Sequence, residues 1–351
     1  MMDSLHSRYP CGALLLVQDG LGNEFDKAGY KVIDTGPRMR RLKRVFFGGY
    51  LMFREVLKLR PKIAHFHDPE LIPWAVLLQL CGISVIYDVH EDYPAAVAEN
   101  GRLPYLLQRV FPPVVLFFEW FGSMIFSGIV AVTPQIAARF RTNKTVVVRN
   151  WPIIAEYENS VGRPMIARQH EVAYIGTITL NRNVIGMLDA IHLARDVDAV
   201  LRLAGDFPVQ LDEEKARVHC GWERVKFDGR ISRGEVADLL SSVRAGLLVL
   251  KPIKHETLTL PIKLFEYMAA GLPVVYSDFP VWREIVGEVR CGLPVDPLKP
   301  EEIADAIRWI LENPEEAAEM GQRGREAAFT RYNWESQVKG LFCLYDKLLE
   351  I

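Results

Sequence analysis

The sequence is poor in the features that mark disulfide-bonded, metal-binding or nucleic-acid-binding proteins. Its five cysteines are scattered along 351 residues, and no two of them have metal-ligand spacing. Because five is an odd number, we do not expect a disulfide framework, and a reducing cytoplasm fits the composition. The formal net charge of -2 at pH 7 gives no support for nucleic-acid binding. No Gly-x-Gly-x-x-Gly motif follows a first strand, which argues against a dehydrogenase.

The first eight residues lack the apolar core and small-residue cleavage site of a signal peptide. One apolar stretch, residues 114–132, approaches membrane-spanning length, which is about 20 residues. Glu119 and two glycines interrupt it, so we interpret it as a helix that ends at 123–127 and a buried strand at 128–133. An alternative is a surface helix that dips into a bilayer interface, because residues 111–121 are rich in phenylalanine and tryptophan.

The chain does contain ample apolar sequence: 50% of its residues are hydrophobic and 25% charged, and its length favours two domains. Short apolar segments that are typical of buried strands alternate with segments of helical periodicity. This pattern predicts parallel sheets covered by helices. We expect strands at 31–34, 63–66, 84–88, 129–132, 145–148, 172–175, 199–204, 225–227, 246–250 and 274–276. Helices are expected at 46–59, 70–80, 105–124, 134–140, 184–194, 233–243 and 263–270, and again from residue 300 onward.

A polar, proline-containing passage at residues 150–169 separates the two halves. We therefore expect an α/β protein with two Rossmann-like αβα domains, at residues 1–160 and 161–332, and a ligand-binding cleft between them. A last helix at 333–351 is expected to pack back on the first domain. Residues 9–20 open the first domain, either as its first strand or as the first helix of a shortened domain.

The most informative segment is residues 258–275, where a helix begins with a cation and a carboxylate on one face. Pro261 suits the first turn, because the amide that it lacks would have no helical partner. The free amides and positive dipole of a helix start favour an anion, and Lys263 adds a full charge. Glu266, one turn further, can accept hydrogen bonds from two vicinal hydroxyls. The segment therefore indicates a site for a nucleotide diphosphate.

The order of these segments resembles the GT-B fold and, within it, the family-4 retaining glycosyltransferases that build bacterial cell-surface glycans. The most specific part is residues 261–273 (PIKLFEYMAAGLP), with weaker matches at 174–176, 203–206 and 227–231. The resemblance extends from about residue 27 to the C-terminus. It implies transfer of a sugar from a nucleotide-diphosphate sugar to a hydroxyl of a glycan or lipid-linked acceptor, with no metal or other cofactor.

The same resemblance implies roles for residues of the second half. Glu266 matches the carboxylate that holds the ribose, while Lys263 and Arg182 match cations that bind the diphosphate. Further donor contacts are expected from loops at the strand ends, namely Gly176, Thr177, Gly229, Arg230, Ile231, Leu258, Thr259, Pro261 and Ile262.

Two positions depart from the family. A second glutamate is usual eight residues before Glu266, and Leu258 stands there instead. Glu256 or His255, slightly upstream, are alternative ligands for the transferred sugar. An arginine commonly follows the glycine that ends the first strand of the second domain, and here that position is Thr177.

In the first half, polar residues 65–71 and 88–94 each follow a predicted strand, where a doubly wound sheet exposes its ligand-binding loops. His90 matches the family's histidine near the reacting sugar and acceptor, and His67, Asp68 and Glu91 are expected to contact substrate. An alternative treats His65, His67 and Asp68 as metal ligands, since alternate strand residues point the same way. That interpretation needs further ligands and an eightfold barrel, so we expect no metal.

We therefore expect a retaining glycosyltransferase of hexosyltransferase type in the cytoplasm, with contact to the inner face of the cell membrane through the 105–124 helix. One alternative is a weakly active or inactive sugar-nucleotide-binding protein. The departures from the family at Leu258 and Thr177 favour this alternative. Another is a sugar-nucleotide epimerase on the same fold. No nucleic-acid partner is expected.

Overall fold

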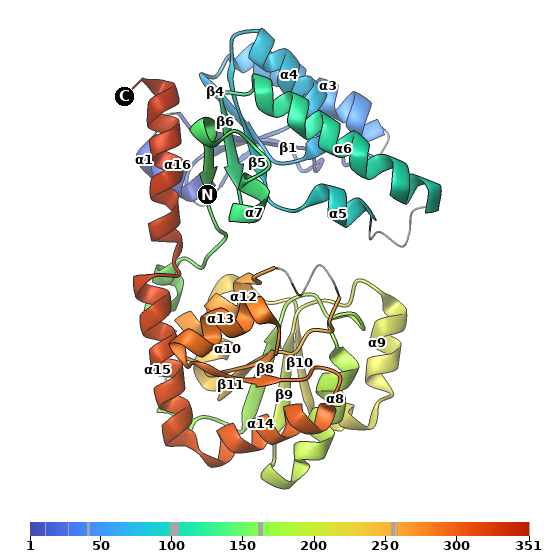
Figure 1. Cartoon of the computed structure of the whole chain (residues 1–351), viewed down its shortest axis with the longest axis vertical. Helices are drawn as coiled ribbons and strands as arrows, with labels where there is room; N and C mark the ends of the chain where they lie inside the picture. The colour runs from blue at the N-terminus through green and yellow to red at the C-terminus, as the bar shows by residue number, and fades with distance from the viewer. Residues whose placement is uncertain are drawn as a thin grey trace. The chain divides into compact units, whose positions relative to one another are not determined.

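The computed structural model describes residues 1–10, 12–26, 28–40, 43–98, 105–160, 164–253, 257 and 259–350. The chain forms two compact units (Figure 1), of which unit 1 comprises Met1–Asn150 with Gln337–Ile351, and unit 2 comprises Trp151–Ser336. The first division falls at the start of the polar passage, earlier than residue 160. The second lies within the last helix, so most of that helix belongs to unit 1.

Unit 2 is built on one six-stranded sheet whose paired strands all run parallel. The strands are β8 (Glu171–Ile175), β9 (Val200–Ala204), β10 (Val225–Gly229), β11 (Ala245–Leu248), β12 (Val274–Ser277) and β13 (Gly292–Val295). Their spatial order is β10-β9-β8-β11-β12-β13, which is the order of a Rossmann-like fold. The central strands read as apolar runs because helices cover both faces of such a sheet.

The sheet of unit 2 carries a helix after most strands, as the sequence periodicity predicts. These helices are α8 (Val184–Leu193), α9 (Gln210–Arg217), α10 (Arg233–Ser242), α12 (Ile262–Ala269), α13 (Pro280–Val289), α14 (Pro300–Glu312) and α15 (Pro314–Thr330). Their buried faces and the strands form one apolar core that includes Trp282, Tyr174 and Tyr267. The expected helices of this half are confirmed, whereas β13, α9 and α13 were not anticipated.

Unit 1 contains a four-stranded parallel sheet and a smaller three-stranded one. The larger has the order β4 (Ile63–Phe66), β5 (Ser84–Val89), β6 (Gly128–Ala131), β7 (Thr145–Val147). In the smaller, β1 (Leu14–Val17) pairs parallel with β3 (Lys31–Asp34), which pairs antiparallel with β2 (Glu24–Phe25). Residues 9–20 therefore contain a strand. The helices are α1 (Met2–Arg8), α3 (Gly49–Leu59), α4 (Ile72–Leu80), α5 (Tyr93–Ala98), α6 (Tyr105–Ile125) and α7 (Pro134–Ala137).

The apolar stretch 114–132 divides between α6 and β6, which confirms its interpretation as a helix and a buried strand. Glu119 of α6 faces the interior of unit 1, where it pairs with Arg139 and accepts a hydrogen bond from the Tyr87 hydroxyl at 3.0 Å. Burial raises the pKa of Glu119, while the charge on Arg139 opposes that rise. Within the residues described above, no helix is both long and apolar enough to cross a membrane.

The C-terminal helix α16 (Trp334–Leu349) belongs to unit 1 from Gln337 onward. The Leu344 side chain lies against Gly128 of β6, where any side chain larger than hydrogen would meet it at 3.0 Å. Asp346 accepts a hydrogen bond from the Tyr9 hydroxyl at 2.5 Å and pairs with Arg8 at 2.6 Å. The two ends of the chain are therefore held together on unit 1.

Three neighbouring strands of unit 2 end in glycines with positive φ angles: Gly176 after β8, Gly205 after β9 and Gly229 in β10. The Gly205 amide donates to the Gly229 carbonyl at 2.7 Å. A Cβ at Gly205 would lie 1.9 Å from the Gly176 carbonyl oxygen, and its φ of +143° is one that other residues rarely adopt. Only glycine fits between the two neighbouring strand ends at this position.

We predict that Gly205→Ala lowers the free energy of unfolding by about 2–5 kcal/mol, because backbone strain and a steric clash add together. Gly229→Ala is the matched control, since its φ is +66° and nothing lies within 4 Å of the added methyl group. The control is expected to cost about 1–2 kcal/mol. Urea unfolding of both variants measures the difference, and equal losses would show that the close approach to Gly176 is not needed.

Candidate functional site

The strand order of unit 2 reverses between β8 and β11, and a doubly wound sheet binds ligands at the carboxyl ends of the strands beside such a point. Gly176 and the loop up to Asn183 follow β8 there. The chain that leaves β11 leads to α12, whose first residues reach the same place. Residues 176–183 and 259–266 therefore form the candidate site of this unit.

Lys263, the second residue of α12, lies directly over Gly176. A Cβ built on Gly176 would be 2.3 Å from Lys263 Cε and 2.6 Å from Nζ, so the lysine occupies the space that a side chain would need. Pro261 precedes the helix with an extended backbone, and its carbonyl accepts the Leu264 amide at 3.1 Å. The site thus combines a fixed ammonium group with the positive end of a helix, two features that favour a phosphate.

Glu266 lies one turn further along α12 and is half-buried. Burial raises the pKa of its carboxyl group, the charges on Lys263 and Arg233 oppose that rise, and Glu156 adds to it. Burial together with the charge on Glu266 raises the pKa of the buried Tyr157 hydroxyl. Among the residues that the structure describes, none donates a hydrogen bond to the Glu266 carboxylate. Its oxygens can therefore accept hydrogen bonds from a ligand.

Two buried aromatic side chains hold α12 against the sheet. The Tyr267 hydroxyl accepts the amide of Ile175, the last residue of β8, at 3.2 Å. Its ring packs over Gly246 of β11, where a Cβ would lie 2.3 Å from the ring. The Trp282 indole donates to the Thr259 carbonyl at 2.6 Å and so fixes the chain just before the helix. These contacts set the positions of Lys263 and Glu266 through the backbone.

The loop between β8 and α8 is held by its own hydrogen bonds. Asn183, buried and in the left-handed conformation, donates from Nδ2 to the carbonyls of Val249 at 2.9 Å and Pro297 at 2.7 Å. The Arg182 amide bonds to Thr179 at 3.1 Å. Thr177 is exposed, and its carbonyl accepts the Tyr174 hydroxyl at 2.9 Å. The structure thus places Gly176, Thr177 and Arg182 in one hydrogen-bonded loop, and the Lys263 side chain of α12 lies over its first residue.

The remaining expected donor residues lie on neighbouring loops. Gly229 ends β10, Arg230 is exposed, and Ile231 packs against the core of unit 2. Thr259 and Ile262 flank the start of α12. Leu258, together with the alternatives His255 and Glu256, lies outside the described residues.

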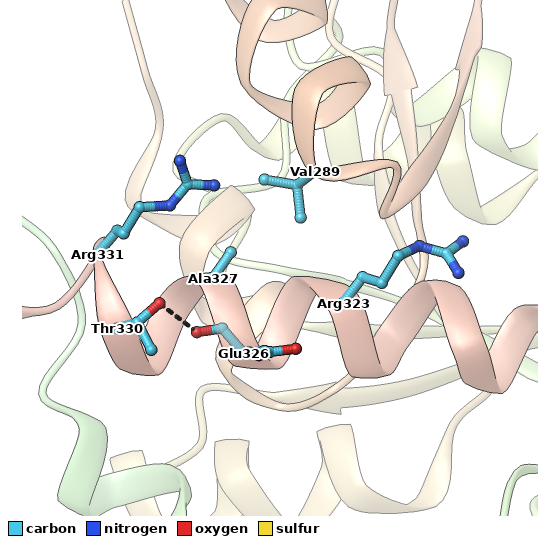
Figure 2. A pocket seen from close by; sticks show the side chains of 6 residues that line it. All are labelled: Val289, Arg323, Glu326, Ala327, Thr330 and Arg331. Carbon is cyan, nitrogen blue, oxygen red and sulfur yellow. Dashed lines mark hydrogen bonds between the residues drawn. The ribbon is translucent and has the colours of Figure 1, made fainter.

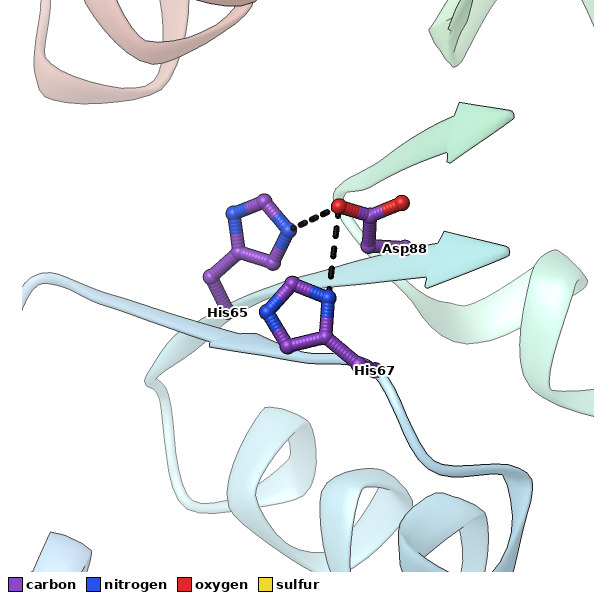
Figure 3. A group of neighbouring side chains, drawn as sticks. All are labelled: His65, His67 and Asp88. Atoms are coloured by element: carbon purple, nitrogen blue, oxygen red, sulfur yellow. Dashed lines mark hydrogen bonds and ion pairs between the residues drawn. The ribbon is translucent and has the colours of Figure 1, made fainter. Parts of the chain in front are cut away.

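Unit 1 holds a cluster of side chains around one buried carboxylate, Asp88 of β5 (Figure 3). His65 Nε2 and His67 Nδ1 lie 3.2 Å and 3.3 Å from the same Asp88 oxygen, Oδ2. The His90 ring stacks on that of His67 with centroids 4.5 Å apart, and its Nδ1 lies 3.6 Å from Asp88 Oδ1. Parallel pairing of β4 and β5 explains the meeting, since His65 is in register with Ile86.

Burial would raise the pKa of the Asp88 carboxyl, but hydrogen bonds from His65 and His67 hold that pKa well below its usual range. Burial lowers the pKa of His65 and of His90, and Asp88 opposes both shifts. The centre of the cluster is therefore a buried carboxylate among imidazoles.

Of the four residues expected to contact substrate in this half, His67 and His90 belong to the cluster. Asp68 and Glu91 are exposed and lie outside it, so the carboxylate beside His65 and His67 is Asp88 rather than Asp68. Sequence reasoning missed Asp88 as a site residue, although a carboxylate at the end of an apolar strand was a usable signal.

A pocket of about 270 Å³ on unit 2 is a weaker candidate (Figure 2). Two arginines stand at its edges, but Arg331 pairs with Glu288 at 2.7 Å and Arg323 donates to the Arg290 carbonyl at 3.0 Å. Both guanidinium groups thus already have partners, and none of the residues singled out in the sequence lines this pocket.

Comparison with known proteins gives one family match: residues 163–327 match the model "Glycosyl transferases group 1". A glycogen synthase of Mycobacterium tuberculosis is 23% identical over 308 residues, which cover 82% of this chain and 71% of that protein. A GDP-mannose-dependent alpha-(1-6)-phosphatidylinositol dimannoside mannosyltransferase of the same species is 32% identical over 162 residues, or 45% of this chain and 40% of its own.

Solved structures resemble nearly the whole chain. The sucrose-phosphate synthase of Thermosynechococcus elongatus superposes with a TM-score of 0.75 at 16% identity, covering 99% of this chain and 92% of that one. Alr3699/HepE of Anabaena, in complex with UDP and glucose, superposes with a TM-score of 0.73 at 14% identity, covering 98% and 94%. At these identities the likeness establishes the fold, and it confirms the expected GT-B architecture of two Rossmann-like units.

We predict that Glu266→Gln raises stability at pH 7 by about 0.5–2 kcal/mol, the range of single stabilising changes. A raised pKa means that the folded state favours the protonated carboxyl, so the charged form above that pKa weakens the fold. The gain should therefore shrink as pH falls through the raised pKa of Glu266.

Glu302→Gln is the control of opposite sign. Hydrogen bonds from Lys299 and the Asp296 amide lower the pKa of Glu302, so its charge supports the fold at pH 7. Thermal melts of both variants between acid and neutral pH make the measurement. A melting point of Glu266→Gln below that of the unmodified protein at pH 7 would contradict the account.

Proposed function

We propose that this chain, a glycosyltransferase of the GT-B fold with a group 1 domain at residues 163–327, transfers a sugar from a nucleotide-diphosphate donor to a glycan or lipid-linked hydroxyl with retention of configuration. The observation that carries the proposal is the position of Lys263 over Gly176, with Glu266 one helical turn away. Alr3699/HepE, which shares the fold, has been seen with UDP-glucose, and that finding supports a nucleotide-sugar donor.

In the proposed complex the diphosphate lies at the start of α12, where Lys263 Nζ, Arg182 and the helix amides neutralise its charge. The Glu266 carboxylate accepts hydrogen bonds from the two ribose hydroxyls. Glycine at residue 176 leaves room for the Lys263 side chain at the end of β8, where that cation would meet the diphosphate. The loop from Thr259 to Ile262 offers backbone amides to the sugar, and residues 229–231 contact the base.

The proposed reaction breaks the bond between sugar C1 and the diphosphate oxygen and forms one between C1 and the acceptor oxygen. The proton of the acceptor hydroxyl passes to the departing diphosphate, as expected when attack occurs on the face that the diphosphate leaves. Cationic groups that stabilise the leaving diphosphate supply most of the rate, so this step is assigned to side chains and not to a metal ion. His90 is assigned to hydrogen bonding with the reacting sugar or the acceptor, beside His67.

A second candidate is a binder of sugar nucleotides with weak or no activity. Thr177 favours it, because an exposed threonine supplies no positive charge where relatives commonly have an arginine. Arg182 in the same loop is the group that would compensate. Turnover separates the two candidates, and a sugar-nucleotide epimerase would change the donor sugar without any acceptor.

We predict that Lys263→Ala and Glu266→Ala each weaken donor affinity by about 10–100-fold, since each removes a charged hydrogen-bonding group worth about 1.5–3 kcal/mol. A thermal-shift panel of UDP, GDP, ADP and their sugars first identifies the donor, because a bound ligand raises the melting point by mass action. Calorimetric titration of the variants with that donor then gives the affinities.

Lys299→Ala serves as the matched control, because this lysine of unit 2 is exposed and pairs with Glu302. His90→Ala, in contrast, should lower transfer to the acceptor while donor affinity stays the same. Unchanged donor binding in the Lys263→Ala, Glu266→Ala double variant would overturn the assignment. If the unmodified protein binds the donor but neither transfers nor epimerises the sugar, its function is sugar-nucleotide binding alone.

The membrane contact proposed for α6 is supported by its exposed face. Phe117 is 55% exposed and Trp120 54%, and neighbouring positions on the helix add further apolar side chains, namely Val110, Phe111, Val114, Leu116, Phe118, Phe121 and Met124. The one acidic residue of α6, Glu119, is buried. Lys144 donates to the Met124 carbonyl at 3.1 Å, which places a cation at the end of the helix. An apolar, acid-free face with a basic end suits an anionic bilayer at the inner face of the membrane.

We predict that the double variant Phe117→Ser, Trp120→Ser loses at least about tenfold in affinity for vesicles of phosphatidylcholine and phosphatidylglycerol, since each ring buries apolar surface in the bilayer. Vesicle co-sedimentation measures the loss. The double variant Leu211→Ser, Val218→Ser is the control, because these residues are exposed apolar groups of unit 2. If the unmodified protein stays in the supernatant, or both variants bind equally, α6 is not the contact.

A further inference from the structure

The Asp88 cluster has the geometry of a metal site as well as that of a hydrogen-bonded network. Three atoms face one another within 4.8 Å: His65 Nε2, His67 Nδ1 and an Asp88 oxygen. The two nitrogens lie 3.2 Å and 3.3 Å from Asp88 Oδ2, and Figure 3 shows both rings turned toward that atom. Ligands at 2.0–2.1 Å from a tetrahedral zinc ion are about 3.3–3.4 Å apart. The two distances to Asp88 Oδ2 therefore have the length of edges in a zinc coordination tetrahedron, and the third edge lies within 4.8 Å.

A contact on the far side of His65 supports this interpretation. His65 Nδ1 lies 2.7 Å from the Tyr345 hydroxyl of α16. Histidines that bind metal usually donate their other ring N–H to a fixed acceptor, which sets the tautomer and the ring orientation. With its proton on Nδ1, His65 presents a lone pair on Nε2 to the cluster.

Burial also fits such a site. The Asp88 side chain is 2% exposed and that of His65 10%, whereas that of His67 is 46% exposed. Asp88 and His65 are thus shielded from water, whereas His67 borders solvent. An ion can therefore reach the site from the His67 side. His90 Nε2 lies 2.5 Å from His67 Nδ1, closer than two ligands of one ion can be, so His90 is not counted as a ligand.

We propose that His65, His67 and Asp88 form a binding site for one divalent transition-metal ion of the zinc type, with Tyr345 orienting His65. Two imidazoles and one carboxylate are a ligand set that suits zinc, and the fourth position is left to water or substrate. On metal binding the His65 proton would move from Nε2, which faces Asp88, to Nδ1, and the Nδ1–H would donate to the Tyr345 hydroxyl oxygen. The ion would connect β4, β5 and, through Tyr345, α16 of unit 1, and it would fix His67 against His90.

This site is separate from the donor site, where the proposed reaction uses side chains to neutralise the diphosphate. The inference therefore does not depend on the proposed function. It concerns the same histidines that are expected to meet the acceptor, and an ion there would set their positions.

The test uses the full-length protein without an affinity tag, stripped with a chelator and titrated calorimetrically with Zn²⁺. Binding of one ion per chain is expected, with a rise in melting temperature. Tyr345→Phe should weaken binding by about 10–100-fold, the usual effect of losing a partner that orients a ligand. His67→Ala should weaken it further. Because His67 is nearly half exposed, the variant should fold, and His67→Gln with circular dichroism checks this independently.

Two controls make the outcome decisive. His170→Ala removes an exposed histidine of unit 2 and should leave zinc affinity unchanged. The exposed cysteines Cys81, Cys220 and Cys343 are further zinc ligands among the described residues, and binding by them would survive His67→Ala. The proposal is overturned if the stripped protein binds no zinc, or if His67→Ala and His67→Gln bind it as tightly as the unmodified protein.

Discussion

The candidate site of unit 2 depends on one steric fit, the packing of the Lys263 side chain over Gly176, which has no Cβ. Gly176 in turn needs Gly205 behind it, because the Gly176 carbonyl occupies the space of a Gly205 side chain. Tyr267 holds α12 against the end of β8, and Trp282 donates to the carbonyl of Thr259, two residues before Pro261. A cation that is fixed before the ligand arrives loses little entropy on binding, so this packing contributes to affinity without touching the ligand.

The same helix carries the carboxylate of Glu266 at a position where its charge destabilises the folded state. Glu266 is half-buried and its pKa is raised, so its charge weakens the folded state while it awaits hydrogen-bond donors. Glu171 and Glu302 differ from Glu266 in this respect. Each of them accepts hydrogen bonds from a neighbouring lysine or arginine. A half-buried acceptor that Lys263 and Arg233 reach through charge alone is what the proposed ribose site requires.

The sequence predicted what is local. The Lys263–Glu266 spacing, the Pro261 helix start and the helix-strand division of residues 114–132 follow from periodicity within about two turns. It did not predict β13, whose Pro294 argues against a strand; the structure places β13 at the sheet edge, where proline is tolerated. The contact between His65 and Tyr345 joins residues 280 positions apart, and nothing in either local pattern indicates it. The close approach of Gly205 to Gly176 likewise appears only once β8 and β9 are paired.

The two units place groups of opposite charge at the carboxyl ends of their parallel strands. Unit 2 gathers cations and helix amides at a strand edge, which suits a ligand that carries negative charge. Unit 1 places a buried carboxylate at the corresponding edge of β5 and surrounds it with imidazoles, which suits a cation, a proton or hydroxyl groups. An acceptor hydroxyl is neutral and needs orientation more than charge neutralisation. Under the proposed function, the ring nitrogens held around Asp88 supply that orientation.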